Sequence, residues 1–299
     1  MRAGVVHAIT GATASGKSAF ALAVAEQCGG EIVSIDSRQV YRGLEIGTAA
    51  PSATDRARVP HHLVGTQDPA SPLSAGQFAR LAGDCIDDVL ARGRTPVLVG
   101  GSTLYLEAIA HGLSPAADVE VDLDALADPL STPGGRQALF AELQAADPEG
   151  AATLDPSKSQ RLGRLVGLLR ATGRPPSALW AEPTVPRHAV EVVVLDRPRD
   201  ELYARIDRRV DRMLAEGLVE ENRVLLAQGL RLDRPPLRTI GYAEVIAHLE
   251  GAIDADEMVR RIKRNSRRYA KRQLTWLRRR DYRWVDARSA RPESILGSR

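Results

Sequence analysis

The sequence predicts an α/β fold in which a parallel β-sheet core has helices on both faces and is interrupted by a small helical insertion domain. Short buried apolar segments at residues 5–10, 31–35, 96–99 and 190–195 alternate with helical patterns. Such alternation is typical of βαβ units and of a parallel sheet. Residues 113–187 are instead rich in Ala, Asp, Pro and Gly and contain no convincing strand. The length of 299 residues also exceeds that of a usual single domain.

The first half of the core is predicted from four segments in order. Residues 5–10 form a buried strand, and a loop of Gly, Ala and Ser leads into a helix from about 17 to 28. A second strand over residues 31–35 ends on Asp36 and Ser37. A helix over residues 74–92 precedes the strand 96–99, and helix resumes after Gly100 and Gly101.

The rest of the chain divides into an insertion and a return to the core. Helical patterns occur around residues 135–146 and 158–171, strand returns at 190–195, and the remainder is mostly helical. We therefore expect a catalytic core of residues 1–112 and 188–299 and a helical insertion domain of residues 113–187.

Composition indicates a soluble globular protein of a reducing compartment. Hydrophobic residues make up 43% of the chain and charged residues 26%, which is ordinary for such a protein. The only two cysteines, Cys28 and Cys85, lack ligand-like spacing, which argues against a disulfide framework and against zinc. No signal peptide or apolar run of membrane-spanning length is present. We expect a cytoplasmic protein without membrane contact.

Positive charge is concentrated near the carboxyl end. Residues 260–283 contain twelve Lys or Arg and a single acid, Asp281; of the chain's 41 basic and 38 acidic residues, this leaves 29 basic and 37 acidic elsewhere. The segment follows a helical pattern, with an apolar stripe formed by Val259, Ile262, Ser266, Tyr269, Gln273 and Trp276. Such a basic helix favours a polyanion such as nucleic acid; a solvated helix face is the alternative.

The loop GATASGKS matches the phosphate-binding pattern G-x-x-x-x-G-K-[ST], between a strand and a helix as that pattern requires. Its glycines allow successive N–H groups to turn inward, and the following helix dipole favours an anion. Lys17 would contact the terminal phosphate oxygens, and Ser18 would ligate Mg²⁺. The predicted phosphate cradle consists of Gly11, Ala12, Thr13, Ala14, Ser15, Gly16, Lys17 and Ser18.

The positions of acidic residues near the strand ends narrow the range of ligands that this loop could bind. A motor or switch NTPase carries an acid after an apolar strand to hold its metal, but the strand 96–99 ends on Gly100 and Gly101. Asp36 instead follows the second strand, where ligands of open α/β sheets gather. A carboxylate there suits a general base acting on a nucleophile; a turn carboxylate is the alternative.

Several motifs together resemble the bacterial tRNA dimethylallyltransferase family. They are GATASGKS at 11–18, SIDSRQVYRG at 34–43, IGTA at 46–49, PHHL at 60–63, VGGSTLY at 99–105, IGY at 240–242 and YAKRQLTW at 269–276. The resemblance implies transfer of the dimethylallyl group from dimethylallyl diphosphate to the exocyclic amine of the adenosine 3′ of the tRNA anticodon. The loop would then hold a diphosphate leaving group with Mg²⁺, and Asp36 would accept the amine proton.

The resemblance also assigns further site residues. The helix RIDRR matches the family's R-I-x-x-R pattern, which implies a catalytic Arg209 with Arg205 as its neighbour. To the tRNA contacts that the family implies we add Lys271 and Arg272 from the charge pattern. The expected tRNA-binding residues are Asp36, Ser37, Arg38, Gln39, Ser102, Gln160, Arg161, Leu162, Gly163, Arg164, Arg238, Thr239, Ile240, Gly241, Tyr242, Ala243, Lys271 and Arg272.

Three other functions share parts of this pattern. A small-molecule kinase would have the same loop and sheet, and an adenylate isopentenyltransferase would prenylate a free nucleotide. Neither needs the basic segment. An RNA-binding switch or chaperone that senses nucleotide would need the acid that is missing after residues 97–99. A monomer suits an enzyme that encloses tRNA.

Overall fold

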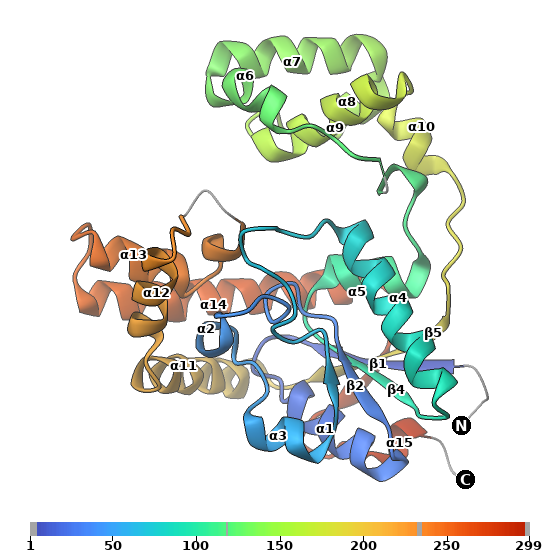
Figure 1. The fold of residues 1–299 in the computed structure, drawn as a ribbon, viewed down its shortest axis with the longest axis vertical. Helices are drawn as coiled ribbons and strands as arrows, with labels where there is room; N and C mark the ends of the chain where they lie inside the picture. Colours follow the sequence, from blue (N-terminus) through green and yellow to red (C-terminus); the bar gives the residue numbers. More distant parts are fainter. Residues whose placement is uncertain (1–4, 118, 232–234, 297–299) are drawn as a thin grey trace. The chain divides into compact units, whose positions relative to one another are not determined.

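The computed structural model describes residues 5–117, 119–231 and 235–296, without the side chains of Val5, Pro115 and Pro235. The chain forms two compact units (Figure 1). Unit 1 comprises residues 1–73, 78–110 and 187–299, and unit 2 comprises residues 74–77 and 111–186.

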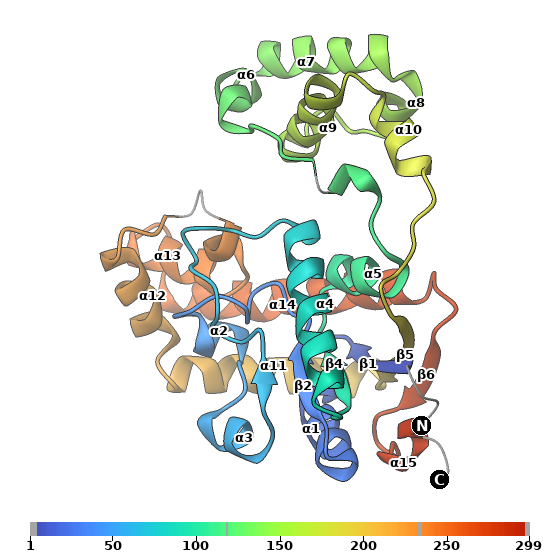
Figure 2. The same ribbon diagram turned by 45° about the vertical axis from the view of Figure 1, so that its right-hand side comes forward.

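Unit 1 contains a six-stranded sheet in the order β3-β2-β4-β1-β5-β6 (Figure 2). All neighbouring strands are parallel, which confirms the predicted parallel sheet. The strands are β1 (Val5–Gly11), β2 (Glu31–Ser34), β3 (His61–His62), β4 (Pro96–Val99), β5 (Ala189–Asp196) and β6 (Arg283–Asp286). Strands β3 and β6 were not predicted, because β3 has two residues and β6 (RWVD) lacks an apolar run.

The strand register brings the functional loops to one edge of the sheet. Ile9 of β1 lies opposite Val99 of β4, and Ser34 of β2 lies opposite the same Val99. The phosphate loop, Asp36 and Gly100 therefore all follow strands that end at the same level. This carboxyl edge is where ligands of open parallel sheets bind.

Helices cover both faces of the sheet because the chain reverses its direction of travel across it. Helix α1 (Lys17–Cys28) connects β1 to β2, and α4 (Ala75–Ala91) connects β3 back to β4. Right-handed crossovers in opposite directions lie on opposite faces. On the α1 face, Ile9, Val97 and Val193 pack with Leu22 of α1 and Ile295 of α15 (Glu293–Leu296).

The remaining unit 1 helices include α5 (Thr103–His111), which returns on the α4 side, and α3 (Ala53–Arg58), which is joined to α1 by the Arg58–Glu26 ion pair. By the same rule α5, between β4 and β5, shares the face of α4, and Phe78 of α4 stacks on Tyr105 of α5 with ring centroids 3.9 Å apart. The other elements are α2 (Glu45–Thr48), α11 (Arg199–Ala215), α12 (Leu218–Ala227), η3 (Pro235–Arg238), α13 (Tyr242–Leu249) and α14 (Ala255–Leu277).

The basic helix α14 differs from its prediction in length and in buried face. It begins after Asp254, whose side chain accepts from the N–H of Glu257, and it ends at Leu277, so the last basic residues of 260–283 lie outside it. Its buried residues are Met258, Ile262, Ala270, Gln273 and Leu277. The predicted stripe was right at Ile262 and Gln273 and wrong at Tyr269, which is 36% exposed, because charged and apolar side chains share the helix flank.

Unit 2 contains helices and no strand among its described residues, and it has its own core. Leu143, Leu162 and Val166 belong to one buried cluster. Asp147, which is 2% exposed, accepts from the N–H groups of Gly150 and Ser177 and from the Ser177 hydroxyl. The elements are η1 (Pro115–Ala117), η2 (Asp124–Leu126), α6 (Ala127–Ser131), α7 (Pro133–Ala146), α8 (Pro148–Ala152), α9 (Ser159–Thr172) and α10 (Pro176–Ala181). Among all described residues, no helix has the length and apolar character needed to cross a membrane.

Candidate active site

The glycine-rich loop has a backbone that only its glycines allow. Gly11 and Gly16 have φ angles of 148° and 102°, a region that L side chains rarely adopt. A Cβ at Gly11 would also lie 2.6 Å from the carbonyl oxygen of Leu195. Gly16 caps α1 without a side-chain hydrogen bond. The first N–H groups of α1 therefore remain available for an anion.

Lys17 is held inside the loop, where its charge is costly. Its side chain is buried, and its Nζ donates to the carbonyl oxygen of Ala12 over 3.3 Å. Burial and, to a smaller extent, the nearby charge of Arg209 lower the pKa of Lys17 to about 8, while Asp36 acts in the opposite direction. An anion in the loop would favour the charged form of this lysine.

Two arginines fix the outer side of the loop through its carbonyl groups. Arg205 Nε donates to the Ala14 oxygen over 2.8 Å, and Arg197 Nε donates to the Ser15 oxygen over 2.7 Å. Arg197 also forms an ion pair with Glu201. Arg205 was predicted as a site residue, whereas Arg197 was not. The only signal for Arg197 was its position directly after β5, at the carboxyl edge of the sheet.

Gln273 connects the basic helix to the loop, a role that the sequence analysis missed. The side chain is 4% exposed. Its Oε1 accepts from the Thr13 N–H over 2.9 Å, and its Nε2 donates to the Gly101 oxygen over 2.7 Å. The Thr13 N–H is therefore already satisfied within the protein. The sequence predicted Gln273 as a member of the apolar stripe and of the YAKRQLTW motif but gave it no role in the loop, because a side-chain amide in a helix does not reveal its partner from the sequence.

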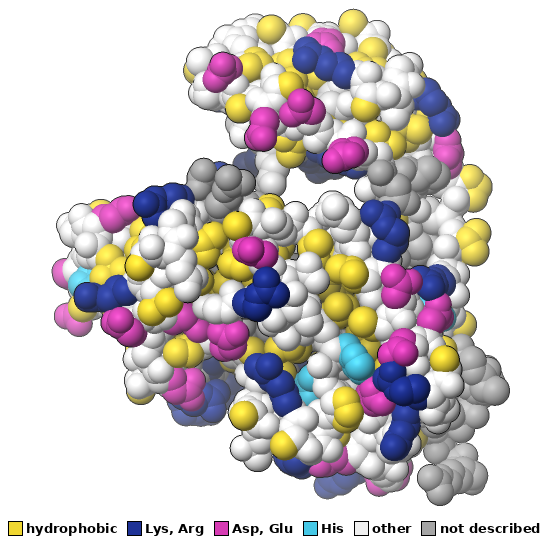
Figure 3. Space-filling view, viewed as in Figure 1, with side chains coloured by type: hydrophobic (Ala, Val, Ile, Leu, Met, Phe, Trp, Pro, Cys, Tyr) yellow, Lys and Arg dark blue, Asp and Glu magenta, His cyan; other side chains and the backbone are white. Residues whose placement is uncertain are grey.

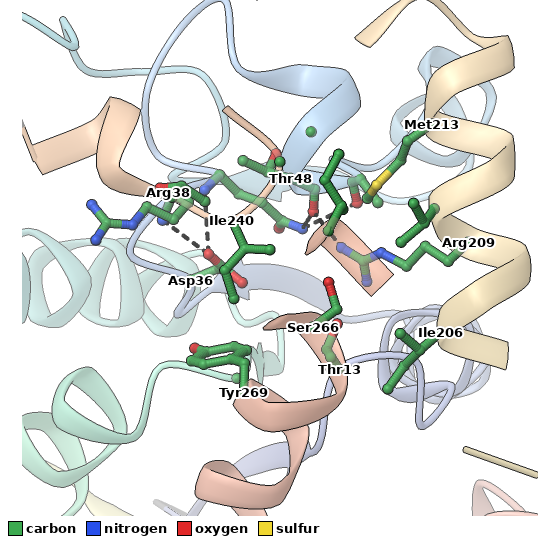
Figure 4. Close-up of a pocket in the computed structure, with 18 of the residues that line it drawn as sticks. Thr13, Asp36, Arg38, Thr48, Ile206, Arg209, Met213, Ile240, Ser266 and Tyr269 are labelled. Carbon is green, nitrogen blue, oxygen red and sulfur yellow. Dashed lines mark hydrogen bonds between the residues drawn. The ribbon is translucent and has the colours of Figure 1, made fainter. Parts of the chain in front are cut away.

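One carboxylate oxygen of Asp36 stabilises a turn of the backbone, and the other accepts no hydrogen bond from the described residues. Its Oδ1 accepts from the N–H groups of Arg38 and Gln39, over 2.9 and 3.4 Å. Its Oδ2 accepts no hydrogen bond from any described residue. Figure 4 shows the carboxylate beside Ile240 and Tyr269, with Arg209 approaching from α11. The turn thus orients Asp36 and leaves one oxygen to act on a ligand.

Arg209 reaches the same site from α11. Its Nη2 donates to the carbonyl oxygen of Thr48 over 3.0 Å, as Figure 4 shows. Burial lowers its pKa, and Asp36 opposes that change. Guanidinium groups keep their charge under such conditions. Arg209 therefore presents a fixed positive charge to the pocket.

Lys17, Asp36, Arg209 and Gln273 share one pocket of about 310 Å³. A second pocket, of about 390 Å³, shares Lys17, Ser18, Ala49 and Arg209 with it and adds Arg205, Arg208 and Arg212. Ser18 is exposed at both pockets. The first pocket is lined by Thr13, Lys17, Ser18, Asp36, Ser37, Arg38, Gln39, Gly47, Thr48, Ala49, Gly101, Ile206, Arg209, Val210, Met213, Arg238, Thr239, Ile240, Gly241, Ile262, Ser266, Tyr269, Arg272 and Gln273.

Most of the tRNA-binding residues expected in unit 1 surround this pocket. Residues 36–39, residues 238–241 and Arg272 line it, whereas Ser102, Ala243 and Lys271 do not. Tyr242 needs a correction. Its side chain is 0% exposed and its hydroxyl donates to Glu221 over 2.7 Å, so it cannot contact tRNA in this conformation. An aromatic residue in a motif does not reveal from sequence which way it points.

Some of the residues expected to bind tRNA in unit 2 are exposed and others are buried. Gln160 and Arg161 are exposed on α9. The prediction is wrong for Leu162 and Gly163: Leu162 is 0% exposed, and a Cβ on the buried Gly163 would lie 2.7 Å from Leu130. One helix face must fill the core of unit 2. Arg164 donates to the carbonyl oxygens of Ala116 and Val119, so it also supports unit 2 itself.

Part of the positive charge of α14 is neutralised within the protein. Lys263 pairs with Asp211 at 2.5 Å and Arg267 with Asp207 at 2.6 Å, both acids of α11. Acidic and basic side chains also lie interspersed on the face shown in Figure 3. Arg264, Arg268, Lys271 and Arg272 form no ion pair with the described residues; the Arg272 guanidinium lies 5.7 Å from the Tyr269 ring.

Family models match nearly the whole chain. A model described as "IPP transferase" matches residues 39–280, and one described as "Isopentenyl transferase" matches residues 4–64. The tRNA dimethylallyltransferase of Salinibacter ruber is 50% identical over 96% of this chain and 90% of its own length. That of Halorhodospira halophila is 48% identical over 91% of this chain and 89% of its own length.

Solved structures agree with this relationship. A tRNA isopentenylpyrophosphate transferase from Bacillus halodurans matches with a TM-score of 0.71 and 37% identity, over 97% of this chain and 93% of that one. A eukaryotic dimethylallyltransferase acting on tRNA matches with a TM-score of 0.81 and 26% identity, over 95% of this chain and 74% of that one. The chain therefore belongs to the IPP transferase family, that of the tRNA dimethylallyltransferases.

Proposed function

We propose that this protein transfers the dimethylallyl group of dimethylallyl diphosphate to the exocyclic amine of the adenosine 3′ of a tRNA anticodon. The observation that carries the proposal is the shared pocket: the open oxygen of Asp36, Arg209 and the phosphate loop all face it. A phosphate loop with a candidate base but without an acid after β4 suits a diphosphate leaving group better than hydrolysis of a nucleotide.

In this proposal the diphosphate lies against residues 11–18. The N–H groups at the start of α1 and the Lys17 ammonium would bind its oxygens, and Arg205 holds the loop in shape through Ala14. The second pocket adds Arg208 and Arg212 on the same side. Stabilising the negative charge that develops on the leaving diphosphate is the largest contribution the protein can make.

The site also suits Mg²⁺ held jointly by protein and substrate. Magnesium usually keeps waters and binds one or two protein oxygens together with phosphate oxygens. The described residues contain no cluster of three His, Cys, Asp or Glu that could hold a metal alone. The exposed Ser18 hydroxyl at the start of α1 is the protein oxygen that fits. When bound, Mg²⁺ would neutralise charge on the diphosphate.

The transfer itself forms one bond and breaks one. The exocyclic nitrogen of adenine bonds to the first carbon of the allyl group, and the bond from that carbon to diphosphate oxygen breaks. The nitrogen loses a proton, which Asp36 Oδ2 would accept while the N–H groups of Arg38 and Gln39 hold Oδ1. Arg209 would stabilise the negative charge on the diphosphate.

tRNA would reach this pocket with its target base turned out of the anticodon loop. Residues 36–39 and 238–241 line the pocket, and Tyr269 and Arg272 of α14 lie at the same site. Turning out a base costs about a few kcal/mol, least in a single-stranded loop. Exposed Gln160 and Arg161 of unit 2, with Ser102, Ala243 and Lys271, remain proposed contacts. We also propose a monomer acting in the cytoplasm, in keeping with two free cysteines.

A transfer assay tests the function directly. The protein is incubated with labelled dimethylallyl diphosphate and Mg²⁺, with either tRNA or AMP as acceptor. We expect label in tRNA and none in AMP. Label in AMP alone would identify an adenylate isopentenyltransferase, and ATP turnover without RNA would identify a small-molecule kinase.

A substitution at Asp36 tests the mechanism. Asp36→Ala removes the proposed base, so the transfer rate should fall about 100- to 10,000-fold, while tRNA affinity stays within a few-fold. Single-turnover transfer and filter binding measure the two quantities. An equal collapse of tRNA binding would make Asp36 a positioning residue instead of the base.

A further inference from the structure

We infer that Glu221 is a positioning residue, which sets the place of Arg209 in the pocket through the short helix α2. The inference rests on the proposed function, because it concerns how that reaction's arginine is held. Glu221 lies on α12, outside both pockets, and none of its atoms lines them. Its effect must therefore pass through another element.

Glu221 caps α2 from a distance in sequence. Its Oε2 accepts from the Ile46 N–H over 2.7 Å, and its Oε1 accepts from the Gly47 N–H over 3.0 Å. These are N–H groups of the first turn of α2, which lack partners within the helix. A carboxylate at this end is also favoured by the helix dipole. Both oxygens of Glu221 are thereby committed to α2.

The other end of α2 holds the pocket side chains. The Thr48 carbonyl accepts from Arg209 Nη2 over 3.0 Å and from Gln39 Nε2 over 3.3 Å. The Ala49 carbonyl accepts from Gln39 Nε2 over 3.1 Å. Because α2 has only four residues, it cannot maintain itself. Its position, and so that of the carbonyl that orients Arg209, depends on these anchors.

Tyr242 fixes Glu221 from the opposite side. Its hydroxyl donates to Glu221 Oε1 over 2.7 Å, and its side chain is 0% exposed. Gly47 packs so closely on this ring that a Cβ there would lie 2.5 Å from it. Three donors thus converge on two carboxylate oxygens. An amide in place of the carboxylate would set its own N–H₂ against one of these donors.

The test compares Glu221→Gln with its neighbour Glu220→Gln. Glu220 is exposed, lines neither pocket and forms a single ion pair with the described residues, to Arg223 at 3.8 Å, so its substitution should leave transfer unchanged. For Glu221→Gln we expect kcat of tRNA prenylation to fall on the order of 10- to 100-fold, because small misplacements of a catalytic group have such effects. The Kd for tRNA should stay within a few-fold. Transfer by the unchanged protein, measured first, tests the proposed function separately.

A double-mutant cycle decides whether the effect passes through Arg209. In an Arg209→Ala background, Glu221→Gln should lower kcat by less than about twofold, because the group it positions is gone. If Glu221→Gln lowers kcat by the same factor in the Arg209→Ala background as in the unchanged protein, the inference is overturned. Asn222→Ala controls for stability, because Asn222 is a buried residue of the same helix whose side-chain amide donates to the Leu218 carbonyl oxygen and not to α2. If it lowers the melting temperature and kcat as much as Glu221→Gln does, the effect is one of folding, and the inference fails.

Discussion

The two polar faces of α11 differ in the charge they carry and in the groups that surround it. On the pocket face, Arg205 and Arg209 contact the carbonyl oxygens of Ala14 and Thr48, and no carboxylate of a described residue lies within ion-pair distance of either. On the other face, Asp207 and Asp211 pair with Arg267 and Lys263 of α14. A carbonyl oxygen orients a guanidinium without neutralising it, whereas a carboxylate cancels its charge. The pocket face therefore keeps its charge for an anionic ligand, and the other face joins two helices.

The same difference changes how the charge of α14 is interpreted. Residues 260–283 contain twelve basic residues, and five of them form ion pairs within the described part of the protein: Arg260, Arg261, Lys263, Arg267 and Arg280. On α14 itself, Arg264, Arg268, Lys271 and Arg272 form no ion pair with the described residues and leave a smaller basic surface. Unpaired cations are the ones that release counterions when phosphates bind.

The largest effect should separate the two faces of α11. Arg209→Ala removes an unpaired charge from the pocket and should lower kcat for prenylation about 100- to 1,000-fold, the scale of a lost transition-state donor. Asp207→Asn, on the packing face, should lower kcat less than about twofold and cost about 1 kcal/mol or less of stability, since the pair is partly exposed. Single-turnover rates and denaturant unfolding measure these quantities.

An equal loss of rate in the two variants would break the comparison. It would mean that the alignment of α11 on α14, and not the charge that faces the pocket, controls the reaction.

The next effect concerns the unpaired cations of α14. Reversing Lys271 and Arg272 to Glu should weaken tRNA binding at least about tenfold at low salt and flatten its dependence on salt concentration, because fewer counterions are released. Reversing the paired Lys263 should change the salt dependence less. Filter binding at several salt concentrations measures both, and equal slopes for the two variants would contradict the distinction between paired and unpaired cations.

The smallest effect comes from the pH dependence of Lys17. The ammonium is lost as pH rises through its pKa of about 8, so the Kd for inorganic diphosphate should rise about fivefold between pH 8 and pH 9. The effect of Lys17 on folding stability has the opposite pH dependence to its effect on diphosphate affinity. Between pH 8 and pH 9 the unfolded chain, with a lysine pKa of about 10.4, binds more protons than the folded protein, so the free energy of unfolding increases as the pH rises. Calorimetric titration measures the Kd.

Lys17→Met is the control for this titration. In this variant diphosphate still ionises but residue 17 does not. The Kd of the variant for diphosphate should therefore rise less with pH than that of the unchanged protein. An identical pH profile in the two proteins would show that Lys17 does not carry the binding charge.

The strongest sequence predictions came from local patterns. Apolar runs located β1, β2, β4 and β5, and the Gly-rich motif located the loop whose φ angles then required glycine at Gly11 and Gly16. The prediction missed β3 and β6, because a two-residue strand and a charged strand are made by their neighbours in the sheet and not by their own residues.

The sequence by itself determined the parallel α/β core, the phosphate loop, the position of Asp36 after β2 and the total charge of the carboxyl-terminal segment. Only the tertiary structure decided which side chains of a motif face the pocket. It turned Tyr242 and Leu162 inward, gave Gln273 to the loop and Glu221 to α2, and paired Lys263 and Arg267 of α14 with acids of α11. The physical reason is that a motif fixes only the order of residues along the chain, whereas burial and pairing depend on elements that are far apart in the sequence. The hydrogen bond between Gln273 and Thr13 is an example.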